Sequence, residues 1–210
     1  LRGIAGIYPN YIQIVASADS GIKTLADLRG KRVAVGAPKS GTEINARAIL
    51  KGAGMTYNDL GKVEYLPFGE SVELMKNRQL DATLISAGLG VSAIRDLATA
   101  VKIVIVPVPQ DVITRIGDPA YIAGTVPANT YEGQAAPVQT AAIQNFLVTH
   151  EGVPTDTVYK MTKAMYEHLD QLVAAHAAAK AIKREDGPKN MPVPLHPGAE
   201  KYYREVGLIK

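Results

Sequence analysis

The sequence predicts an α/β fold with a parallel, doubly wound sheet, and two observations carry this prediction. Short β-branched apolar runs alternate with segments of helical periodicity from about residue 31 to residue 116. The connections between these segments are short, as they are in βα units. With 210 residues, the chain can bury one core or divide into two lobes.

The composition excludes several kinds of chemistry. The net charge of +3 is spread along the chain without a basic block, so we expect no nucleic-acid partner. The absence of cysteine excludes disulfides, thiolate catalysis and cysteine-ligated metals. The four histidines lack metal-binding spacing, and no G-x-S-x-G elbow occurs. No catalytic nucleophile with a nearby base is evident in the sequence, and we expect no metal or cofactor.

The first segments are extended. Residues 3–8 and 11–16 have strand character, and Pro9-Asn10 between them predicts a break into two strands. Residues 19–21 form a predicted turn, and residues 24–30 form a capped helical turn that ends at a glycine.

The segment from residue 31 to residue 53 contains the first complete βα unit. A strand at 33–35 meets Gly36, and a helix at 41–53 follows, with an apolar face at i, i+3, i+4 spacing. Ser40 and Glu43 stand three apart at its start, which predicts a capping box. Because the first helical N–H groups lack partners, this corner favours an anion such as a carboxylate or phosphate.

The alternation continues to the C-terminus. We expect strands at 63–66, 82–86 and 102–108, and helices at 71–77, 91–100 and 110–116. An extended run at 121–126 and a turn at 127–134 precede a strand at 138–148. Pro154 is expected to open one long helix reaching about residue 183, and a last short helix covers 198–206. The apolar face of the long helix is predicted to consist of Val158, Met161, Met165, Leu169 and Leu172.

The sequence contains partial matches to two nucleotide-binding motifs. Gly36 and Gly41 have the spacing of a Walker A loop, but Thr42 stands where the lysine is required. Residues 88–93 match G-x-G-x-x-A between a strand and a helix, and Asp111 follows about twenty residues later, where a ribose-binding carboxylate would lie. An NAD-linked oxidoreductase that uses this turn is therefore an alternative.

Several segments resemble the TAXI family, the solute-binding receptors of TRAP transporters. The resemblance is carried by RGIAGIYP (2–9), DSGIKTLADLRGKRVAVG (19–36), SGT (40–42), residues 122–134 and PLHPGAEKYYRE (194–205). These matches follow the order of the family and extend over essentially the whole chain. The resemblance implies a periplasmic receptor of the two-lobed, periplasmic-binding-protein type with doubly wound sheets and no catalytic activity.

The resemblance also implies a domain layout. Residues 17–125 would form the second lobe, and residues 1–16 and 126–210 the remainder of a first lobe. Family members carry a signal peptide and about half of the first lobe before the point that matches Leu1. We therefore expect that this part lies upstream, that the first lobe is incomplete here, and that the protein is periplasmic.

The implied ligand is a small carboxylate solute, such as glutamate, glutamine or a dicarboxylate, and the implied partners are the membrane subunits of a TRAP transporter. Amides and hydroxyls at 40–42 would hold the carboxylate, and the end of a neighbouring strand would form the opposite wall. Aromatic and amide side chains at strand ends or in loops would complete the site. The predicted ligand-binding residues are Tyr8, Ser40, Gly41, Thr42, Phe68, Ser86, Ala87, Gly88 and Gln134. A second alternative is the effector-binding domain of a transcription regulator, which would share the fold.

Overall fold

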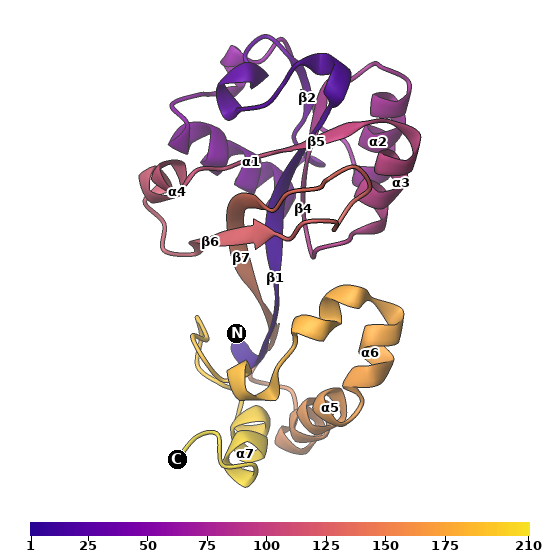
Figure 1. Ribbon diagram of the computed structural model, residues 1–210. Helices are drawn as coiled ribbons and strands as arrows, with labels where there is room; N and C mark the ends of the chain where they lie inside the picture. The colour runs from indigo at the N-terminus through magenta and orange to yellow at the C-terminus, as the bar shows by residue number, and fades with distance from the viewer. The chain divides into compact units, whose positions relative to one another are not determined.

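The computed structural model describes all 210 residues and divides them into two compact units (Figure 1). Unit 1 consists of residues 1–9 and 144–210, and unit 2 of residues 10–143. Two long strands, β1 (Arg2–Ser17) and β7 (Val138–Thr149), contribute residues to both units. Residues 10–16 and 126–143, which we expected with the first lobe, belong to unit 2. The second half of β1 pairs there with other strands, and β7 forms a hairpin with its neighbour.

The sheet is mixed rather than wholly parallel, which corrects the sequence prediction. Its strand order is β3-β2-β4-β1-β7-β6, with β5 also paired to β1. β2 runs parallel to β3 and β4, whereas β1 is antiparallel to β4 and β5. The remaining strand bounds are β2 Arg32–Ala34, β3 Lys62–Glu64, β4 Ala82–Ala87, β5 Ile103–Val106 and β6 Tyr121–Val126. The parallel βα units are thus built onto a strand of opposite direction, which precedes them in the chain.

Helices cover both faces of the sheet in unit 2, as the doubly wound prediction requires (Figure 1). On one face lie α1 (Gly41–Gly52) and α4 (Gln110–Ile116), and on the other α2 (Phe68–Lys76) and α3 (Ser92–Ala100). Side chains of β1 alternate between the two cores: Ile12 and Ile14 pack with α1 and α4, and Val15 packs with α2 and α3. The α/β fold class is confirmed.

Strand β1 continues through Pro9 and Asn10, so the predicted break at this dipeptide is wrong. Two side-chain amides of β7 bind carbonyl groups of β1 here: Gln144 donates to Ile7 at 3.0 Å and Asn145 donates to Tyr8 at 2.9 Å. These bonds satisfy the backbone beside a proline that has no N–H group of its own.

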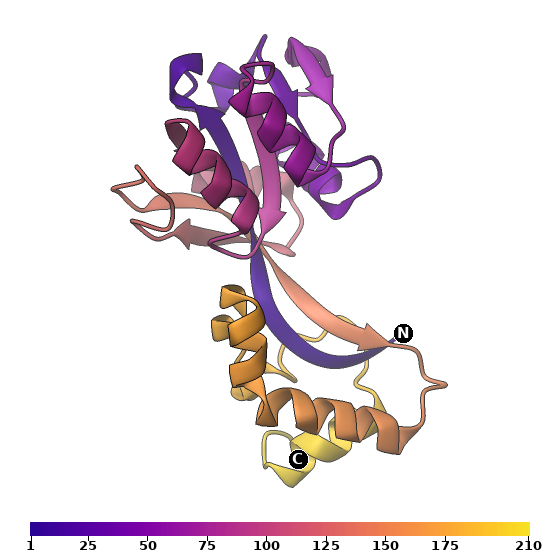
Figure 2. The same cartoon turned by 90° about the vertical axis from the view of Figure 1, so that its right-hand side faces the viewer.

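Unit 1 contains α5 (Thr155–Glu167), α6 (Leu169–Ala175) and α7 (Pro197–Glu205). The long helix predicted from Pro154 is interrupted at His168, whose backbone leaves the helical region, and α6 turns away from α5 (Figure 2). The predicted apolar face is only partly correct: Val158 is buried, but Met161 and Leu172 are 47% and 38% exposed. The core is instead built on tyrosines of α5 and α7, and the fully buried Tyr203 donates to the Ile4 carbonyl at 2.8 Å.

Short 3-10 segments connect these elements, at Ala18–Ser20, Leu25–Leu28, Tyr57–Asp59, Ala177–Ala181 and Arg184–Asp186. None of the helices combines the length and the apolar character that crossing a lipid bilayer requires.

Candidate functional site

The corner between β2 and α1 has the geometry that the sequence predicts for a helix start. Ser40 is the N-cap, and its Oγ accepts the Glu43 N–H at 3.2 Å. The reciprocal half of the predicted capping box is absent, because the Ser40 N–H donates to the Ala37 carbonyl. The Glu43 carboxylate binds Arg47 and the Tyr57 hydroxyl instead. The Ser40 hydroxyl is therefore committed to the helix cap.

Gly41 and Thr42 occupy the first two positions of α1, where no helical carbonyl is available to their N–H groups. Thr42 is only 7% exposed, and its hydroxyl forms no hydrogen bond within the protein. A Cβ at Gly36, which has φ +97°, would lie 2.7 Å from the Thr42 methyl carbon. Gly36 thus lets the end of β2 approach α1 closely and fixes the position of Thr42.

The carboxyl end of β4 joins this corner through a buried chain of hydrogen bonds. The Asn45 amide donates to Ser86 Oγ at 2.8 Å, and the Tyr121 hydroxyl donates to Asn45 Oδ1 at 2.9 Å. Asn45 and Ser86 are only 8% and 9% exposed. Burial raises the pKa of Tyr121, so its hydroxyl keeps its proton. Our sequence reasoning missed Asn45 and Tyr121, although a polar residue on the apolar face of the predicted helix was a signal for the first.

The electrostatics of the corner favour an anion. The Glu43 carboxylate lies beside Arg47 and accepts the Tyr57 hydroxyl at 3.0 Å, so its charge is paired. The Arg47 guanidinium also stacks 5.2 Å from the centre of the Tyr57 ring. Burial, and then the hydrogen bond to Glu43, raise the pKa of Tyr57 and keep it a donor. What remains unpaired is a set of donors at the positive end of a helix dipole.

The loop after β4 is held by the side chains of Gln13 and Tyr131. Gln13 donates to the Ala87 carbonyl at 3.3 Å, and the Gly90 N–H donates to the Tyr131 hydroxyl at 3.1 Å. Tyr131 also donates to Gln13, which is fully buried. Ala87 and Gly88 are therefore placed at the same sheet edge as Ser86 by a fixed loop.

This arrangement does not favour dinucleotide binding at residues 88–93. The Gly90 amide, which a pyrophosphate would need, is already bound to Tyr131. The Arg95 guanidinium lies against Gly90, where a Cβ would meet it at 2.8 Å. Asp111 forms an ion pair with Arg115 on α4, and α4 covers the face of the sheet opposite to α3.

The predicted residues divide into those that share this edge and those that do not. Phe68 begins α2 and packs partly against the core of that face. Gln134 is buried, and its amide holds the turn by donating to the Pro127 and Ala136 carbonyls at 2.9 and 2.8 Å. Tyr8 belongs to unit 1, where it stacks on His176 at 6.1 Å. The residues that lie at the ends of the adjacent strands β2 and β4 are Ser40, Gly41, Thr42, Ser86, Ala87 and Gly88.

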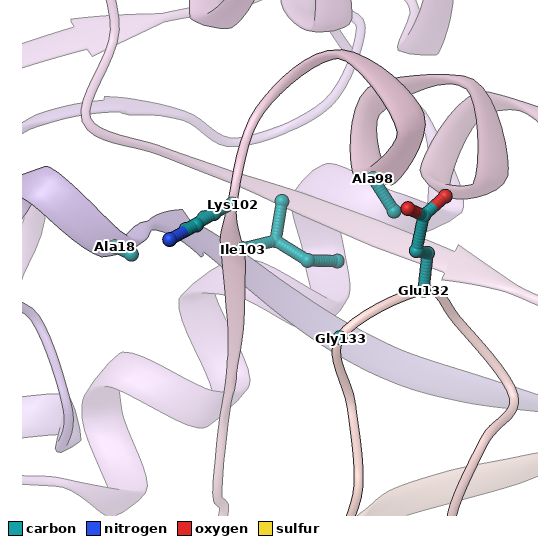
Figure 3. A pocket seen from close by; sticks show the side chains of 6 residues that line it. All are labelled: Ala18, Ala98, Lys102, Ile103, Glu132 and Gly133. Atoms are coloured by element: carbon teal, nitrogen blue, oxygen red, sulfur yellow. The ribbon is translucent and has the colours of Figure 1, made fainter.

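A cavity of about 430 Å³ lies elsewhere in unit 2 (Figure 3). Strand registers place it at the opposite end of the sheet, because Ser17 pairs with Ile103 there, whereas Tyr11 pairs with Ala87 at the candidate site. The Lys102 amino group points toward Ala18, and the Glu132 carboxylate lies beside Ala98 (Figure 3). No predicted ligand-binding residue lines this cavity; its lining consists of Ala18, Ala98, Lys102, Ile103, Glu132 and Gly133.

Comparison with solved structures finds transport proteins at low similarity. The aliphatic sulphonate binding protein SsuA of Escherichia coli is 14% identical with a TM-score of 0.45, over 86% of this chain and 56% of that one. A substrate binding protein of a Streptococcus pneumoniae ABC uptake transporter, with bound histidine, is 18% identical with a TM-score of 0.47, over 88% and 62%. A putative L-cystine ABC transporter of Listeria monocytogenes is 15% identical with a TM-score of 0.43, over 89% and 64%.

The chain thus spans less than two thirds of the length of each of these proteins, and likeness at this level assigns it no ligand and no transporter. Comparison with family models gives a match to nearly the whole chain. The model described as the NMT1-like family matches residues 1–207, and the chain therefore belongs to the NMT1-like family.

Proposed function

We propose that the protein is an extracytoplasmic solute-binding receptor without catalytic activity. It captures a small carboxylate solute, such as glutamate, glutamine or a related dicarboxylate, and delivers it to the membrane subunits of a TRAP transporter. The resemblance of residues 2–9, 19–36, 40–42, 122–134 and 194–205 to the TAXI family supports the transporter class. The observation that carries the binding function is the set of unpaired donors where β2 and β4 end.

These groups are hydrogen-bond donors, and a carboxylate has two oxygens that can accept from them. The Gly41 and Thr42 N–H groups and the Thr42 hydroxyl can each donate to an anionic oxygen, and the helix dipole adds a positive potential. Hydrogen bonds to a charged group contribute about 1.5–3 kcal/mol each, roughly twice those between neutral groups. An ammonium group would meet donors only, so the edge favours the acid end of an amino acid.

The same edge offers one carboxylate subsite rather than two. Arg47, a candidate for a second carboxylate, is bound to Glu43 and packs on Tyr57. The second acidic or amide group of the solute would therefore need a partner other than Arg47. A contact from Tyr8 and closure of two lobes around the solute remain predictions from the family resemblance.

A thermal-shift screen of the full-length protein tests this function. The panel contains L-glutamate, L-glutamine, dicarboxylates, 2-oxo acids and NAD(H). A ligand at one hundred times its Kd stabilises the folded state by about 2.7 kcal/mol, which shifts Tm by several degrees. We expect a shift with at least one carboxylate, and its loss in Thr42→Val.

Thr99→Val is the matched control, because Thr99 is exposed on α3 and its hydroxyl bonds only to the Asp96 carbonyl. We expect this control to keep the ligand-induced shift. A wild-type protein that responds to none of the acids, or only to NAD(H), would contradict the proposed function.

A further inference from the structure

The hydrogen bonds at the carboxyl end of β4 run in one direction. The Tyr121 hydroxyl donates to Asn45 Oδ1, an oxygen that can only accept. The Asn45 Nδ2 group, which can only donate, bonds to Ser86 Oγ at 2.8 Å. Because Ser86 Oγ is the acceptor of this bond, its own proton is left for a further acceptor, and no protein group takes it.

We propose that Tyr121, acting through Asn45, orients the Ser86 hydroxyl as a donor to the solute carboxylate. This inference rests on the proposed function and deepens it. Ser86 joins the Thr42 hydroxyl and the first amides of α1 as a donor to the anion. Tyr121 and Asn45 are positioning residues, since neither needs to touch the solute.

The reverse direction of these hydrogen bonds would turn the Ser86 proton away from the solute. With Asn45 Nδ2 toward Tyr121, Ser86 would donate to Asn45 Oδ1, and its lone pairs alone would face the solute. Asn45 and Ser86 are more than nine-tenths buried, so water does not compete freely for the bonds between them. In the structure the Tyr121 hydroxyl donates to Asn45 Oδ1, and this bond leaves Nδ2 for Ser86 and the Ser86 proton for the ligand.

A double-mutant cycle tests this role by calorimetric titration of the full-length protein with L-glutamate and with glutarate. We expect Tyr121→Phe and Ser86→Ala each to weaken binding of the preferred acid about tenfold or more. Ser86→Ala removes the donor to the charged group, and Tyr121→Phe removes the bond that orients this donor through Asn45. The double variant is expected to bind no more weakly than Ser86→Ala alone. If Tyr121 had only a structural role, Tyr121→Phe would weaken binding further in the Ser86→Ala background.

Two further variants complete the experiment. Tyr159→Phe is the matched control, because it removes a tyrosine hydroxyl that bonds to Glu205 rather than to Asn45; its affinity should equal that of the wild type. Asn45→Asp places acceptors on both sides of the chain and turns the Ser86 proton inward, so it should abolish binding of the acid. Thermal melts without ligand verify that each variant is folded.

The outcomes separate the inference from the function on which it rests. Unchanged affinity in Tyr121→Phe, or a loss in the double variant equal to the product of the two single losses, overturns the role of Tyr121 alone. Failure of the wild type to bind either acid or any other carboxylate of the panel overturns the proposed function, and the inference with it.

Discussion

Replacement of Gly36 by alanine perturbs the corner that positions Thr42. The residue has φ +97°, a conformation that side chains rarely adopt, and it faces the start of α1. An alanine Cβ would lie 2.7 and 2.8 Å from two Thr42 carbons and 3.1 Å from the Glu43 nitrogen. Because the last of these is helix backbone, the clash cannot be relieved by rotating one side chain.

The expected cost has two parts. A left-handed conformation costs an alanine about 1–2 kcal/mol relative to glycine. Overpacking against a fixed neighbour adds about 1–3 kcal/mol. We therefore expect Gly36→Ala to lower the free energy of unfolding by about 2–5 kcal/mol, and to weaken carboxylate binding because Thr42 must shift.

Gly21→Ala is the matched control. Gly21 has φ +72°, but nothing lies within 4 Å of the position of its Cβ. It should therefore lose only the conformational part, about 1–2 kcal/mol. Urea unfolding followed by circular dichroism measures both free energies, and equal losses in the two variants would refute the contact between Gly36 and Thr42.

Two further predictions concern stability. Hydrogen bonds from Arg32 lower the pKa of Asp81, so its stabilising contribution is present above the ordinary value of about 3.9 and is lost as pH falls through the lower folded-state pKa. Asp81→Asn should lower the free energy of unfolding by about 1.5–3 kcal/mol at neutral pH. Urea unfolding at a series of pH values should show this difference from the wild type disappearing below about pH 4. A difference that stays constant with pH would contradict a stabilising ion pair between Asp81 and Arg32. Tyr203→Phe removes the buried donor to the Ile4 carbonyl and should cost about 1–3 kcal/mol in urea unfolding. Tyr159→Phe removes a hydroxyl that bonds to the exposed Glu205 carboxylate and should cost less; similar losses would count against a buried role for Tyr203.

Local patterns in the sequence were sufficient for the βα units of unit 2. The helix expected at 41–53 ends one residue earlier in the structure, and the strand expected at 82–86 extends by one residue. Both segments combine a clear period with glycine or polar boundaries, so short-range signals determine them. The fold class followed from the same units.

Features that depend on contacts between distant segments were not predictable in this way. Pro9 lies inside β1 because two amides of β7, more than one hundred residues away in the chain, bind the neighbouring carbonyls. The break at His168 carries no glycine or proline signal. Tyr121 meets Asn45 only because its strand returns to the sheet beside β7, and that pairing has no local signature.

The candidate site shows the same division. The corner at Ser40, Gly41 and Thr42 could be predicted because a cap and a helix start are local. The capping box was only half correct, since Arg47 and Tyr57 bind the Glu43 carboxylate that the pattern assigned to the cap. Gln134 as a ligand-binding residue stays a prediction: its Nε2 donates to carbonyls of its own turn, and its buried Oε1 has no partner in the protein.

A nuclear magnetic resonance titration of the ¹⁵N-labelled full-length protein tests the central claim most directly. The amide signals of Gly41 and Thr42 are followed while L-glutamate or a dicarboxylate is added. We predict that these two signals shift most, that they saturate together, and that the shifts disappear in Thr42→Val. Saturating shifts confined to Gly90 and its loop, or to the cavity at Lys102 and Ile103, would contradict a carboxylate site at the carboxyl ends of β2 and β4.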